Sequence, residues 1–413
     1  MSTTSLSISD QLQALAAINA DPDAGGITRE VFTPHYTQAS EYVTGLMERA
    51  GLTVRTDAFG NLRGRLEGAT SATAAVLTGS HIDTTLNAGA YDGVLGVLGA
   101  IEAVRRLLAT GWLPDRPVEV VCFAGEEPRF GSGCIGSRAM MGTLTRADLD
   151  TMRDRFGVSI ADAMRSVGLD PDRIAEVQLD PAGVHAFVEL HIEQGSRLEA
   201  MQLPIGVVTH IAAPHDLLVT LSGVAAHAGA TPMGARRDAL AGAAELVLRL
   251  EQLAQESASG STVGTVGVIS ARPGAINVIP GEVALQVDIR DHDLTARAAV
   301  VEAFLAEVQT VTAARGLRYT IETITLDDPA ACAAVVVDAA RDACRELGIA
   351  FTDIVSGAYH DAMVLGAVVP MGMVFVPSRD GISHSPHEYT APEDLERGIT
   401  VLAATLRNLA RGS

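Results

Sequence analysis

Residues 77–108 read LTGSHIDTTLNAGAYDGVLGVLGAIEAVRRLL, and this stretch determines how the rest of the chain is interpreted. It opens on an apolar run typical of a buried strand. It ends on an apolar stripe at helical spacing, formed by Val94, Val97, Leu98, Ile101, Val104 and Leu108. Between strand and helix lie His81, Asp83 and Asp92. Charges beside core segments are costly unless partners or cations neutralise them, so the stretch predicts a functional site.

A second apolar run, VEVVCFAGEE at residues 118–127, follows the helix and also ends on polar residues. This order of strand, helix and strand predicts an α/β fold, with a mostly parallel or mixed sheet and helices on both faces. In such sheets, polar residues at the carboxyl ends of the strands project into the crevice where ligands bind. Two helices are expected before this stretch, at about 7–20 and 36–50, the second ending near Gly51.

The middle of the chain predicts a separate inserted domain at residues 212–328. Strand and helix patterns follow one another there over 217–223, 235–255, 262–272, 282–291, 294–315 and 318–325. The resulting order, β-α-β-β-α-β, is the split βαβ arrangement of a small α+β domain. Residues 1–211 and 329–413 are then expected to form one catalytic domain.

The composition excludes several classes of protein. With 413 residues, 47% hydrophobic and 19% charged, the chain is globular and long enough for two domains. The net charge of -20 argues against nucleic acid or an anionic membrane as a partner. The first 25 residues lack the pattern of a secretory signal, so none is expected, and no apolar run is long enough to span a membrane. Its four cysteines are too few for a disulfide framework, so a reduced, cytoplasmic protein is expected.

Polar residues at the strand ends suggest metal chemistry. His81 and Asp83 are two positions apart on a strand end, so their side chains point the same way, and Asp83 supplies the carboxylate partner that a metal-binding imidazole usually needs. Asp92 follows in a glycine-flanked loop, where its two oxygens can bridge two cations. Glu126 and Glu127 diverge as neighbours, so one can ligate a metal while the other faces a bound water.

Two later motifs add histidines. His191 lies on a strand with Glu189 and Glu193 on the same face, and His384 lies in a late loop. Each piece alone has an ordinary explanation, because an isolated histidine is more often a hydrogen-bonded core residue and a Glu-Glu pair is usually a solvated turn. Together, three histidines, one aspartate and one glutamate match a site for two cations bridged by one carboxylate.

The order and wording of the motifs resemble one family. The motifs are GSHIDT, AYDG, AGEEPRFG, GSR, HIEQG, AHAGATPM, NVIPG, DIR, GAYHDA and GISHSPHE. They are similar to those of the hydantoinase/carbamoylase branch of the di-zinc aminoacylase/carboxypeptidase superfamily. That branch includes N-carbamoyl-L-amino acid hydrolases, β-ureidopropionases, allantoate amidohydrolases and ureidoglycolate amidohydrolases. The resemblance runs from about residue 35 to the end, and HIEQG and SHSPHE favour these amidases over peptidases.

The resemblance implies two divalent metal ions per chain. One ion is expected among His81, Asp92 and His191, and the other among Asp92, Glu127 and His384. Zinc or manganese is expected, and cobalt or nickel also suits such nitrogen and oxygen ligands.

The same resemblance implies roles for residues that bind no metal. Glu126 is expected to act as general base and then acid, and Asp83 to orient His81. His227 matches the family histidine that binds the carbonyl oxygen in the transition state, and this role is favoured over the alternative of a turn histidine before a helix. Arg290 matches the arginine that grips the substrate carboxylate, although without the family it reads as a strand residue paired with Asp288 or Asp291.

Further polar residues match family contacts to the ureido group and carboxylate. These are Gln194 and Asn277, each of which could instead be an ordinary turn or strand-end amide, and His360, whose role is less defined. Tyr359 stands where many relatives have glycine, so it either shapes the substrate pocket or packs as a core aromatic.

The implied activity is metal-dependent hydrolysis of an N-carbamoyl-L-amino acid or a related ureido acid. Allantoate or ureidoglycolate amidohydrolase is the nearest alternative, followed by an acyl-amino-acid deacylase or peptidase, and by a metal-binding scaffold without turnover. The small ureido acid is the expected partner, and the inserted domain is expected to mediate a homodimer by resemblance, through an edge strand.

Overall fold

The computed structural model describes residues 6–412, which form two compact units. The first unit runs to Thr209 and resumes over Ala331–Ser356 and from His360 onward. The second comprises His210–Ala330 and Gly357–Tyr359. The sequence analysis placed Tyr359 in the catalytic domain, but the short segment 357–359 packs with the second unit, where the Gly357 carbonyl lies 3.5 Å from Arg290 Nη1.

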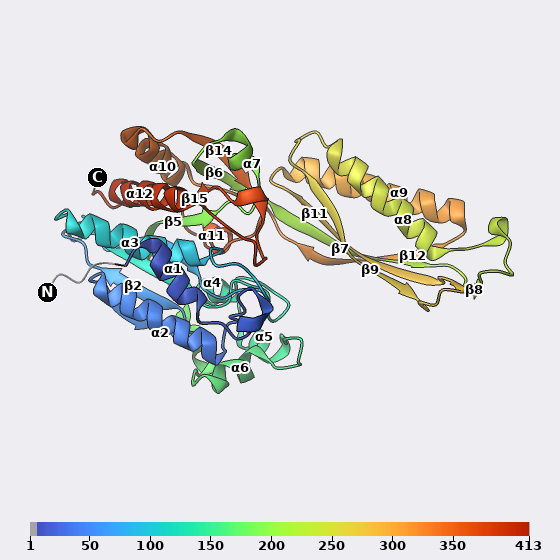
Figure 1. Cartoon of the computed structure of the whole chain (residues 1–413), viewed down its shortest axis with the longest axis horizontal. Helices are drawn as coiled ribbons and strands as arrows, with labels where there is room; N and C mark the ends of the chain where they lie inside the picture. The colour runs from blue at the N-terminus through green and yellow to red at the C-terminus, as the bar shows by residue number, and fades with distance from the viewer. Residues whose placement is uncertain (1–5, 413) are drawn as a thin grey trace. The chain divides into compact units, whose positions relative to one another are not determined.

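A mixed sheet forms the centre of the first unit (Figure 1). Its strands are β1 (Thr53–Thr56), β2 (Leu62–Leu66), β3 (Ala75–His81), β4 (Val118–Phe123), β5 (Val184–Ile192), β6 (Ile205–Ile211), β13 (Ala330–Ala331), β14 (Phe351–Ser356) and β15 (Met371–Val376). They are ordered β1-β2-β4-β3-β5-β15-β6-β13, and β14 also pairs with β6. Strands β4, β3, β5 and β15 run parallel. The pairs β1–β2, β2–β4 and β15–β6 are antiparallel.

Helices pack on both faces of this sheet, as the alternation of side chains along β15 shows. The helices are α1 (Ile8–Ala16), α2 (Pro34–Arg49), α3 (Val94–Ala109), α4 (Ile135–Met140), α5 (Arg146–Thr151), α6 (Ile160–Ser166), α7 (Arg197–Met201), α10 (Ala334–Leu347), α11 (Asp361–Gly366) and α12 (Pro392–Leu409). Met371 lies against Gly366 of α11. Gly372 and Val376 lie against Val336 of α10 and Gly398 of α12. Odd and even positions of a strand point to opposite faces, so α11 lies opposite α10 and α12.

Short 3-10 segments connect these elements. They are η1 (Pro22–Ala24), η2 (Pro171–Val177), η3 (Pro181–Gly183) and η5 (Arg379–Gly381), and η4 (Met233–Ala235) lies in the second unit. The first predicted helix is shorter than expected, because the chain turns after Ala16 and the Asn19 side chain bonds to the backbone of Gly26 and Thr28.

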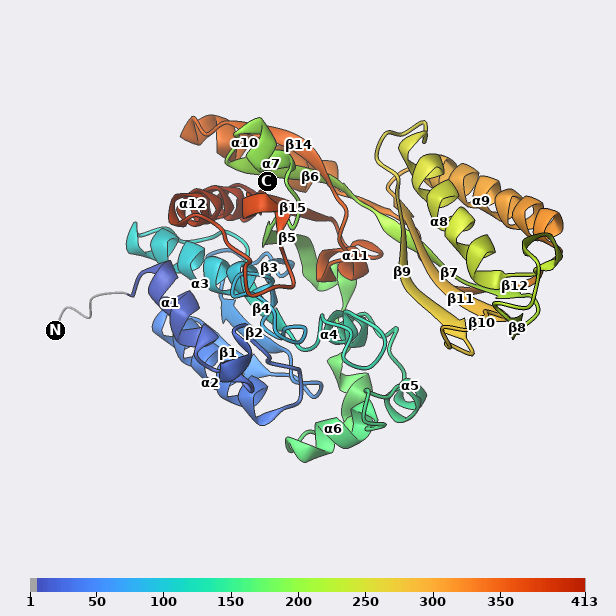
Figure 2. The same cartoon turned by 45° about the vertical axis from the view of Figure 1, so that its right-hand side comes forward.

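The second unit is an antiparallel sheet with two helices on one face (Figure 2). Its strands β7 (Ala213–Ser222), β9 (Val263–Arg272), β11 (Glu282–Asp291) and β12 (Arg318–Leu326) are ordered β12-β7-β11-β9. Its helices are α8 (Ala239–Gln255) and α9 (Leu294–Arg315). Alternate residues of β7 and β11, including Val219, Leu221, Leu285 and Val287, form a core with these helices. A short pair, β8 (Ala226–His227) and β10 (Val278–Ile279), stands beside the sheet.

The order β7-α8-β9-β11-α9-β12 is the one that the sequence predicts for this unit. The predicted start of its first helix at residue 235 is wrong. The helix begins at Ala239, because the Asp238 side chain accepts the backbone N–H groups of Leu240 and Ala241 and so caps it there.

Two general expectations can be compared with the structure. Cys122, Cys134, Cys332 and Cys344 are all free thiols. Among residues 6–412, no helix combines the length and apolar character needed to cross a membrane.

Candidate active site and metal centre

The candidate site lies at the carboxyl ends of adjacent parallel strands. His81 is the last residue of β3, His191 is the penultimate residue of β5, and Glu127 follows β4. His384 lies in the loop after β15. Because β4, β3, β5 and β15 are parallel neighbours, their ends meet at one edge of the sheet.

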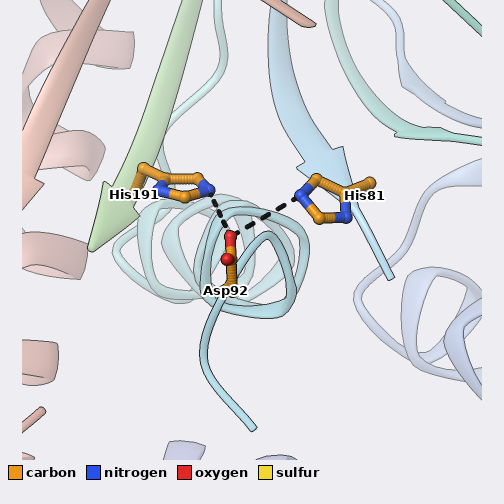
Figure 3. A group of neighbouring side chains, drawn as sticks. All are labelled: His81, Asp92 and His191. Atoms are coloured by element: carbon orange, nitrogen blue, oxygen red, sulfur yellow. Dashed lines mark ion pairs between the residues drawn. The ribbon is translucent and has the colours of Figure 1, made fainter. Parts of the chain in front are cut away.

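The first donor group consists of His81, Asp92 and His191, all of them buried. Asp92 Oδ1 lies 3.1 Å from His191 Nε2 and 3.8 Å from His81 Nε2. Figure 3 shows Asp92 rising from the turn before α3 to point between the two imidazoles. Two nitrogens and one oxygen thus converge on one point, which suits a divalent cation.

The second donor group shares Asp92 through its other oxygen. Asp92 Oδ2 lies 3.1 Å from His384 Nε2, and this nitrogen lies 3.4 Å from Glu127 Oε1. The side chain of His384 is 51% exposed, whereas those of Asp92 and Glu127 are buried, so this group opens to solvent on its histidine side. The two groups together have the geometry of a bridged two-cation site.

The hydrogen bonds of the two buried histidines fix their Nδ1 atoms and leave their Nε2 atoms facing Asp92. His81 Nδ1 donates to the Asp83 carbonyl at 3.0 Å, and His191 Nδ1 donates to the Ile192 carbonyl at 2.9 Å. The backbone N–H of Gly93 donates to His191 Nε2 at 3.2 Å. Once they lose a proton, the Nε2 atoms direct their lone pairs at the oxygens of Asp92, and a cation between them removes the repulsion, so these residues fit a metal ion.

The electrostatics of the carboxylates lead to the same conclusion. Burial raises the pKa of Glu127 to about 8, and burial together with the neighbouring Glu127 raises the pKa of Glu126 well above its usual range. Burial alone would raise the pKa of Asp92, but hydrogen bonds from His191 and His384 hold it well below the usual range. A dense set of acidic groups of this kind stays ionised when divalent cations neutralise it.

The site leaves no room for a side chain at Gly93, the residue just before α3. Its φ is +65°, and a Cβ atom at this position would lie 2.3 Å from His81 Nε2. Glycine therefore lets the turn that carries Asp92 approach the imidazole of His81.

Glu126 lies beside the first donor group, as expected for a base. Its Oε2 is 3.7 Å from His81 Nε2, and its Oε1 is 3.4 Å from the sulfur of Cys134. The structure therefore directs one carboxylate oxygen toward the metal ligands and the other away from them.

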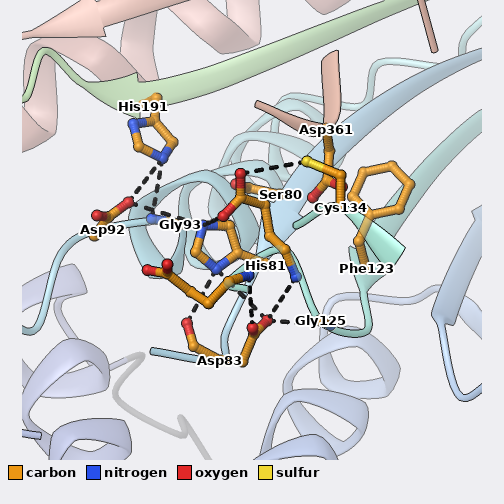
Figure 4. A network of polar contacts seen from close by, with 12 residues as sticks. Ser80, His81, Asp83, Asp92, Gly93, Phe123, Gly125, Cys134, His191 and Asp361 are labelled. Carbon is orange, nitrogen blue, oxygen red and sulfur yellow. Dashed lines mark hydrogen bonds and ion pairs between the residues drawn. The ribbon is translucent and has the colours of Figure 1, made fainter. Parts of the chain in front are cut away.

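The contacts of Asp83 differ from the simple expectation. The backbone carbonyl of Asp83 makes the close contact to His81 Nδ1, while its carboxylate Oδ1 is 3.6 Å away. The carboxylate instead accepts the backbone N–H groups of Gly125, Glu126 and Glu127. Figure 4 shows the contact between Asp83 and Gly125. Asp83 therefore orients His81 chiefly through its backbone and holds the loop that carries both glutamates.

Two residues matched to substrate contacts make protein contacts within this unit. Gln194 Nε2 donates to Asp92 Oδ2 at 2.7 Å, while its buried Oε1 has no hydrogen-bond partner among residues 6–412. His360 is buried, with Nε2 2.9 Å from Ser356 Oγ and its ring 4.6 Å from the ring of His191. Both therefore lie next to residues of the first donor group.

A further candidate group joins His360 and His191 to Glu189. Glu189 already accepts hydrogen bonds from Ser80 Oγ at 2.6 Å and from the backbone N–H of Ala362 at 3.2 Å. Because protein donors satisfy both of its oxygens, we interpret Glu189 as a structural support of the site.

Glu388 and Ser383 also belong to the site, although neither was predicted as a site residue from the sequence. Glu388 Oε1 accepts the backbone N–H groups of Tyr91 and Asp92 at 2.8 and 3.1 Å. Ser383 Oγ lies 3.0 Å from Asp92 Oδ2 and 2.8 Å from Glu388 Oε2. The motif GISHSPHE could have pointed to Glu388, because this acidic residue follows His384 by four positions.

The remaining candidate residues belong to the second unit. His227 and Asn277 lie together, because β8 pairs with β10 and the backbone N–H of Ala228 donates to the Asn277 carbonyl at 2.9 Å. His227 Nδ1 accepts the backbone N–H groups of Gly229 and Ala230, so its proton is on Nε2 and this atom is a hydrogen-bond donor.

Arg290 forms the ion pair that the sequence left open as an alternative. Its Nε and Nη2 donate to the carboxylate of Asp288 at 2.7–2.9 Å. Asp291 lies on the other side of the strand, where Ser259 and Thr262 donate to it. Asp288 thus uses one edge of the guanidinium of Arg290 and leaves N–H groups of Nη1 and Nη2 for another anion.

Comparison with known proteins identifies the family. The family model described as peptidase family M20/M25/M40 matches residues 79–408. The chain belongs to this family. Its M20 membership accounts for the paired donor groups, since enzymes of the M20 family are metal-dependent.

Relatives within the M20 family share almost the whole chain. The sequence is 44% identical over 403 residues to the N-carbamoyl-L-amino acid amidohydrolase of Geobacillus stearothermophilus, covering 97% of this chain and 98% of the relative. It is 42% identical over 406 residues to the ureidoglycolate hydrolase of Oryza sativa subsp. japonica, covering 97% and 84%.

A solved structure confirms the predicted fold class and branch. The hydantoinase/carbamoylase family amidase from Burkholderia multivorans has a TM-score of 0.88 and 36% identity, covering 98% of this chain and 97% of that one. The chain is therefore an M20 hydrolase of the hydantoinase/carbamoylase type.

Proposed function

We propose that this enzyme hydrolyses the ureido C–N bond of an N-carbamoyl-L-amino acid or a related ureido acid, which yields the amine, carbon dioxide and ammonia. The observation that carries the proposal is that Asp92 joins two donor groups while Glu126 lies beside one of them. The names of the relatives from Geobacillus and rice support a ureido substrate.

Ureido hydrolysis needs the chemistry that this site offers. A ureido carbonyl is a weak electrophile, because two nitrogens donate electron density into it. Two divalent cations, when held by His81, His191, His384, Glu127 and the shared Asp92, acidify water and polarise a carbonyl oxygen. Zinc and manganese are the proposed ions, and cobalt or nickel also suits these ligands.

Glu126 supplies the proton transfers in this scheme. Its carboxylate accepts a proton from the attacking water and returns it to the departing nitrogen. The Asp83 carboxylate keeps the backbone of Glu126 in place through its hydrogen bond to that residue's N–H. Gln194 holds Asp92 through Nε2 and offers its free Oε1 as an acceptor for a ureido N–H.

Residues of the second unit would bind the rest of the substrate. His227 Nε2–H would donate to the carbonyl oxygen as negative charge develops there, and the neighbouring Asn277 would contact the ureido group. Arg290 would bind the substrate carboxylate with the edge of its guanidinium that Asp288 does not use. We also propose that His360, whose ring lies 4.6 Å from that of His191, contacts the substrate.

Allantoate or ureidoglycolate hydrolysis is the main alternative within the same chemistry. A screen for ammonia release over N-carbamoyl-L-amino acids, β-ureidopropionate, allantoate and ureidoglycolate distinguishes them, with Glu126→Gln as the inactive control. N-acetyl amino acids and dipeptides, assayed for the free amino acid, test the deacylase and peptidase alternatives. Cleavage of these compounds without any ammonia release from the ureido acids would disprove the proposal.

We further propose a homodimer formed through the second unit. Edge strand β9 exposes Val263, Val268 and Ile269, and an exposed apolar edge is a natural pairing surface. Light scattering should give twice the chain mass, and Ile269→Lys should shift it to the monomer. A monomeric wild type would contradict this.

We also propose a cytoplasmic location, which is in keeping with the free thiols. Cell fractionation tests this location.

A further inference from the structure

Cys134 lies next to the proposed base and has no role in the scheme above. Its sulfur is 3.4 Å from Glu126 Oε1. The residue is fully buried and stands at the start of α4 in a left-handed conformation, with φ 56°. A fixed backbone at this point aims the thiol in one direction.

The backbone holds Cys134 and Glu126 in a fixed relationship. The N–H of Cys134 donates to the carbonyl of Glu126 at 2.8 Å, and the N–H of Ile135 donates to the carbonyl of Gly125 at 2.8 Å. Gly133 allows this close approach, because a Cβ atom there would lie 2.7 Å from the Glu126 carbonyl oxygen. The backbones of Cys134 and Glu126 are therefore held next to each other.

A second contact fixes the other side of Cys134. Ser137 Oγ lies 3.0 Å from the Cys134 carbonyl and 2.5 Å from Asp361 Oδ1, and both Ser137 and Asp361 are fully buried. Asp361 lies beside Cys134 in Figure 4. The thiol is thus placed between two acidic side chains, which favours an S–H group that donates to a carboxylate.

A donor to one oxygen of Glu126 would fix the direction of the other oxygen, which lies on the side of the first donor group. Rotation about the last torsion of a glutamate is weakly restricted by itself, so an unheld carboxylate samples many orientations. The Cys134 thiol contacts Oε1, while Oε2 lies 3.7 Å from His81 Nε2. A hydrogen bond to Oε1 therefore selects the rotation that directs Oε2 toward the metal ligands.

We propose that Cys134 is a positioning residue for the general base, donating its S–H to Glu126 Oε1 so that Oε2 faces the attacking water. This inference rests on the role proposed for Glu126. It concerns the orientation of the carboxylate and involves no covalent chemistry of the thiol.

Turnover measurements test the functional half of the proposal. Cys134→Ala removes the donor but keeps a Cβ, so the backbone strain at φ 56° is the same as in the wild type. We expect kcat to fall on the order of tenfold while KM changes by less than about twofold, because misplaced reacting groups slow the chemical step. Cys134→Ser keeps a hydroxyl donor and should recover most of kcat.

A matched control separates positioning from loss of a buried thiol. Cys344→Ala makes the same change in α10, where the thiol is also buried, and should leave kcat unchanged. Equal kcat in Cys134→Ala and the wild type, or a Cys134→Ser variant as slow as Cys134→Ala, would overturn the positioning role.

Infrared spectroscopy tests the contact without turnover. The difference spectrum between wild type and Cys134→Ala isolates the S–H stretching band of Cys134. Glu126→Gln replaces the carboxylate by a weaker acceptor and should move this band to higher frequency. An unmoved band would disprove the hydrogen bond. A moved band in an enzyme that releases no ammonia from any ureido acid would leave the contact in place and reject the proposed function instead.

Discussion

Asp83 Oδ2 accepts the backbone N–H of Glu127 at 3.0 Å, although the two residues are far apart in the chain. The other carboxylate oxygen of Asp83 accepts the N–H groups of Gly125 and Glu126. The Asp83 carbonyl meanwhile holds His81 Nδ1. One residue thereby sets the positions of a ligand in each metal group and of the proposed base.

Asp83→Asn should therefore weaken metal binding and catalysis together. Asparagine keeps one acceptor oxygen, but its amide N–H₂ faces a backbone N–H of the loop. We expect metal affinity or kcat to fall about 10- to 100-fold, the usual effect of a changed partner behind a metal ligand. Metal analysis after dialysis and steady-state kinetics measure this.

Asp293→Asn is the matched control for Asp83. Asp293 also accepts two backbone N–H groups, those of Thr295 and Ala296, but it does so at the start of α9 in the second unit. Its variant should retain full metal content. Equal effects of the two substitutions would show that the loss in Asp83→Asn reflects general destabilisation.

Gly93→Ala should remove the metal ion that His81 binds. The added Cβ would lie 2.3 Å from His81 Nε2, so the imidazole or the Asp92 turn must move. Gly111→Ala is the control, because Gly111 also has positive φ, +80°, but no heavy atom lies within 4 Å of its added Cβ. Metal counting should give fewer ions per chain for Gly93→Ala and the wild-type number for Gly111→Ala. Full occupancy in Gly93→Ala would contradict the first donor group.

Much of this site follows from strand ends that the sequence marks clearly. His81, Glu127 and His191 each follow an apolar run, and parallel strands bring such ends to one edge. The inserted unit is equally clear, because turn residues separate long alternating strands from apolar helices. These features are local in the sequence, so pattern alone predicts them.

Contacts between distant segments could not be predicted in this way. Glu388 binds the backbone of Asp92 across 296 positions, and the Asp83 carboxylate holds a loop more than 40 positions away. Cys134 reads as an ordinary small core residue until α4 places it against Glu126. Such pairings depend on how the chain folds back on itself, so the sequence marks Glu388 by its place near His384 but does not show which backbone groups it binds.

Metal affinity should increase as pH rises toward 9. Burial alone would lower the pKa of His191, but its contact with Asp92 outweighs this and raises the pKa to about 9. Contact with Asp92 likewise raises the pKa of His384 to about 9, and burial raises that of Glu127 to about 8. Below these values the groups hold protons that a cation must displace, so acidification favours the metal-free protein.

Chelator competition at pH 6, 7 and 8 measures this dependence. We expect the dissociation constant for manganese to fall by at least about tenfold from pH 6 to pH 8, since binding releases protons from the ligands. His384→Ala should flatten the curve for the second ion. A dissociation constant that is independent of pH would contradict the assignment of these ligands.

Glu126→Gln should abolish turnover and leave the metal centre intact. Glutamine has the shape of glutamate but cannot accept the proton of water, and Glu126 is not one of the five donors that surround the metal positions. We expect kcat to fall about 10²- to 10⁴-fold, as for the loss of a general base. Metal content measured on the same sample should equal that of the wild type. Retained activity would assign the proton transfer to another group.

His227→Asn should slow catalysis without disturbing the loop that holds the histidine. The amide oxygen of asparagine takes the place of His227 Nδ1 and can still accept the N–H groups of Gly229 and Ala230. The variant lacks the Nε2–H donor, so a developing oxyanion loses one hydrogen bond, which typically costs about 10²–10³ in kcat. Thermal unfolding should match the wild type. Wild-type kcat with an unchanged melting temperature would show that the histidine serves only the turn between β8 and α8.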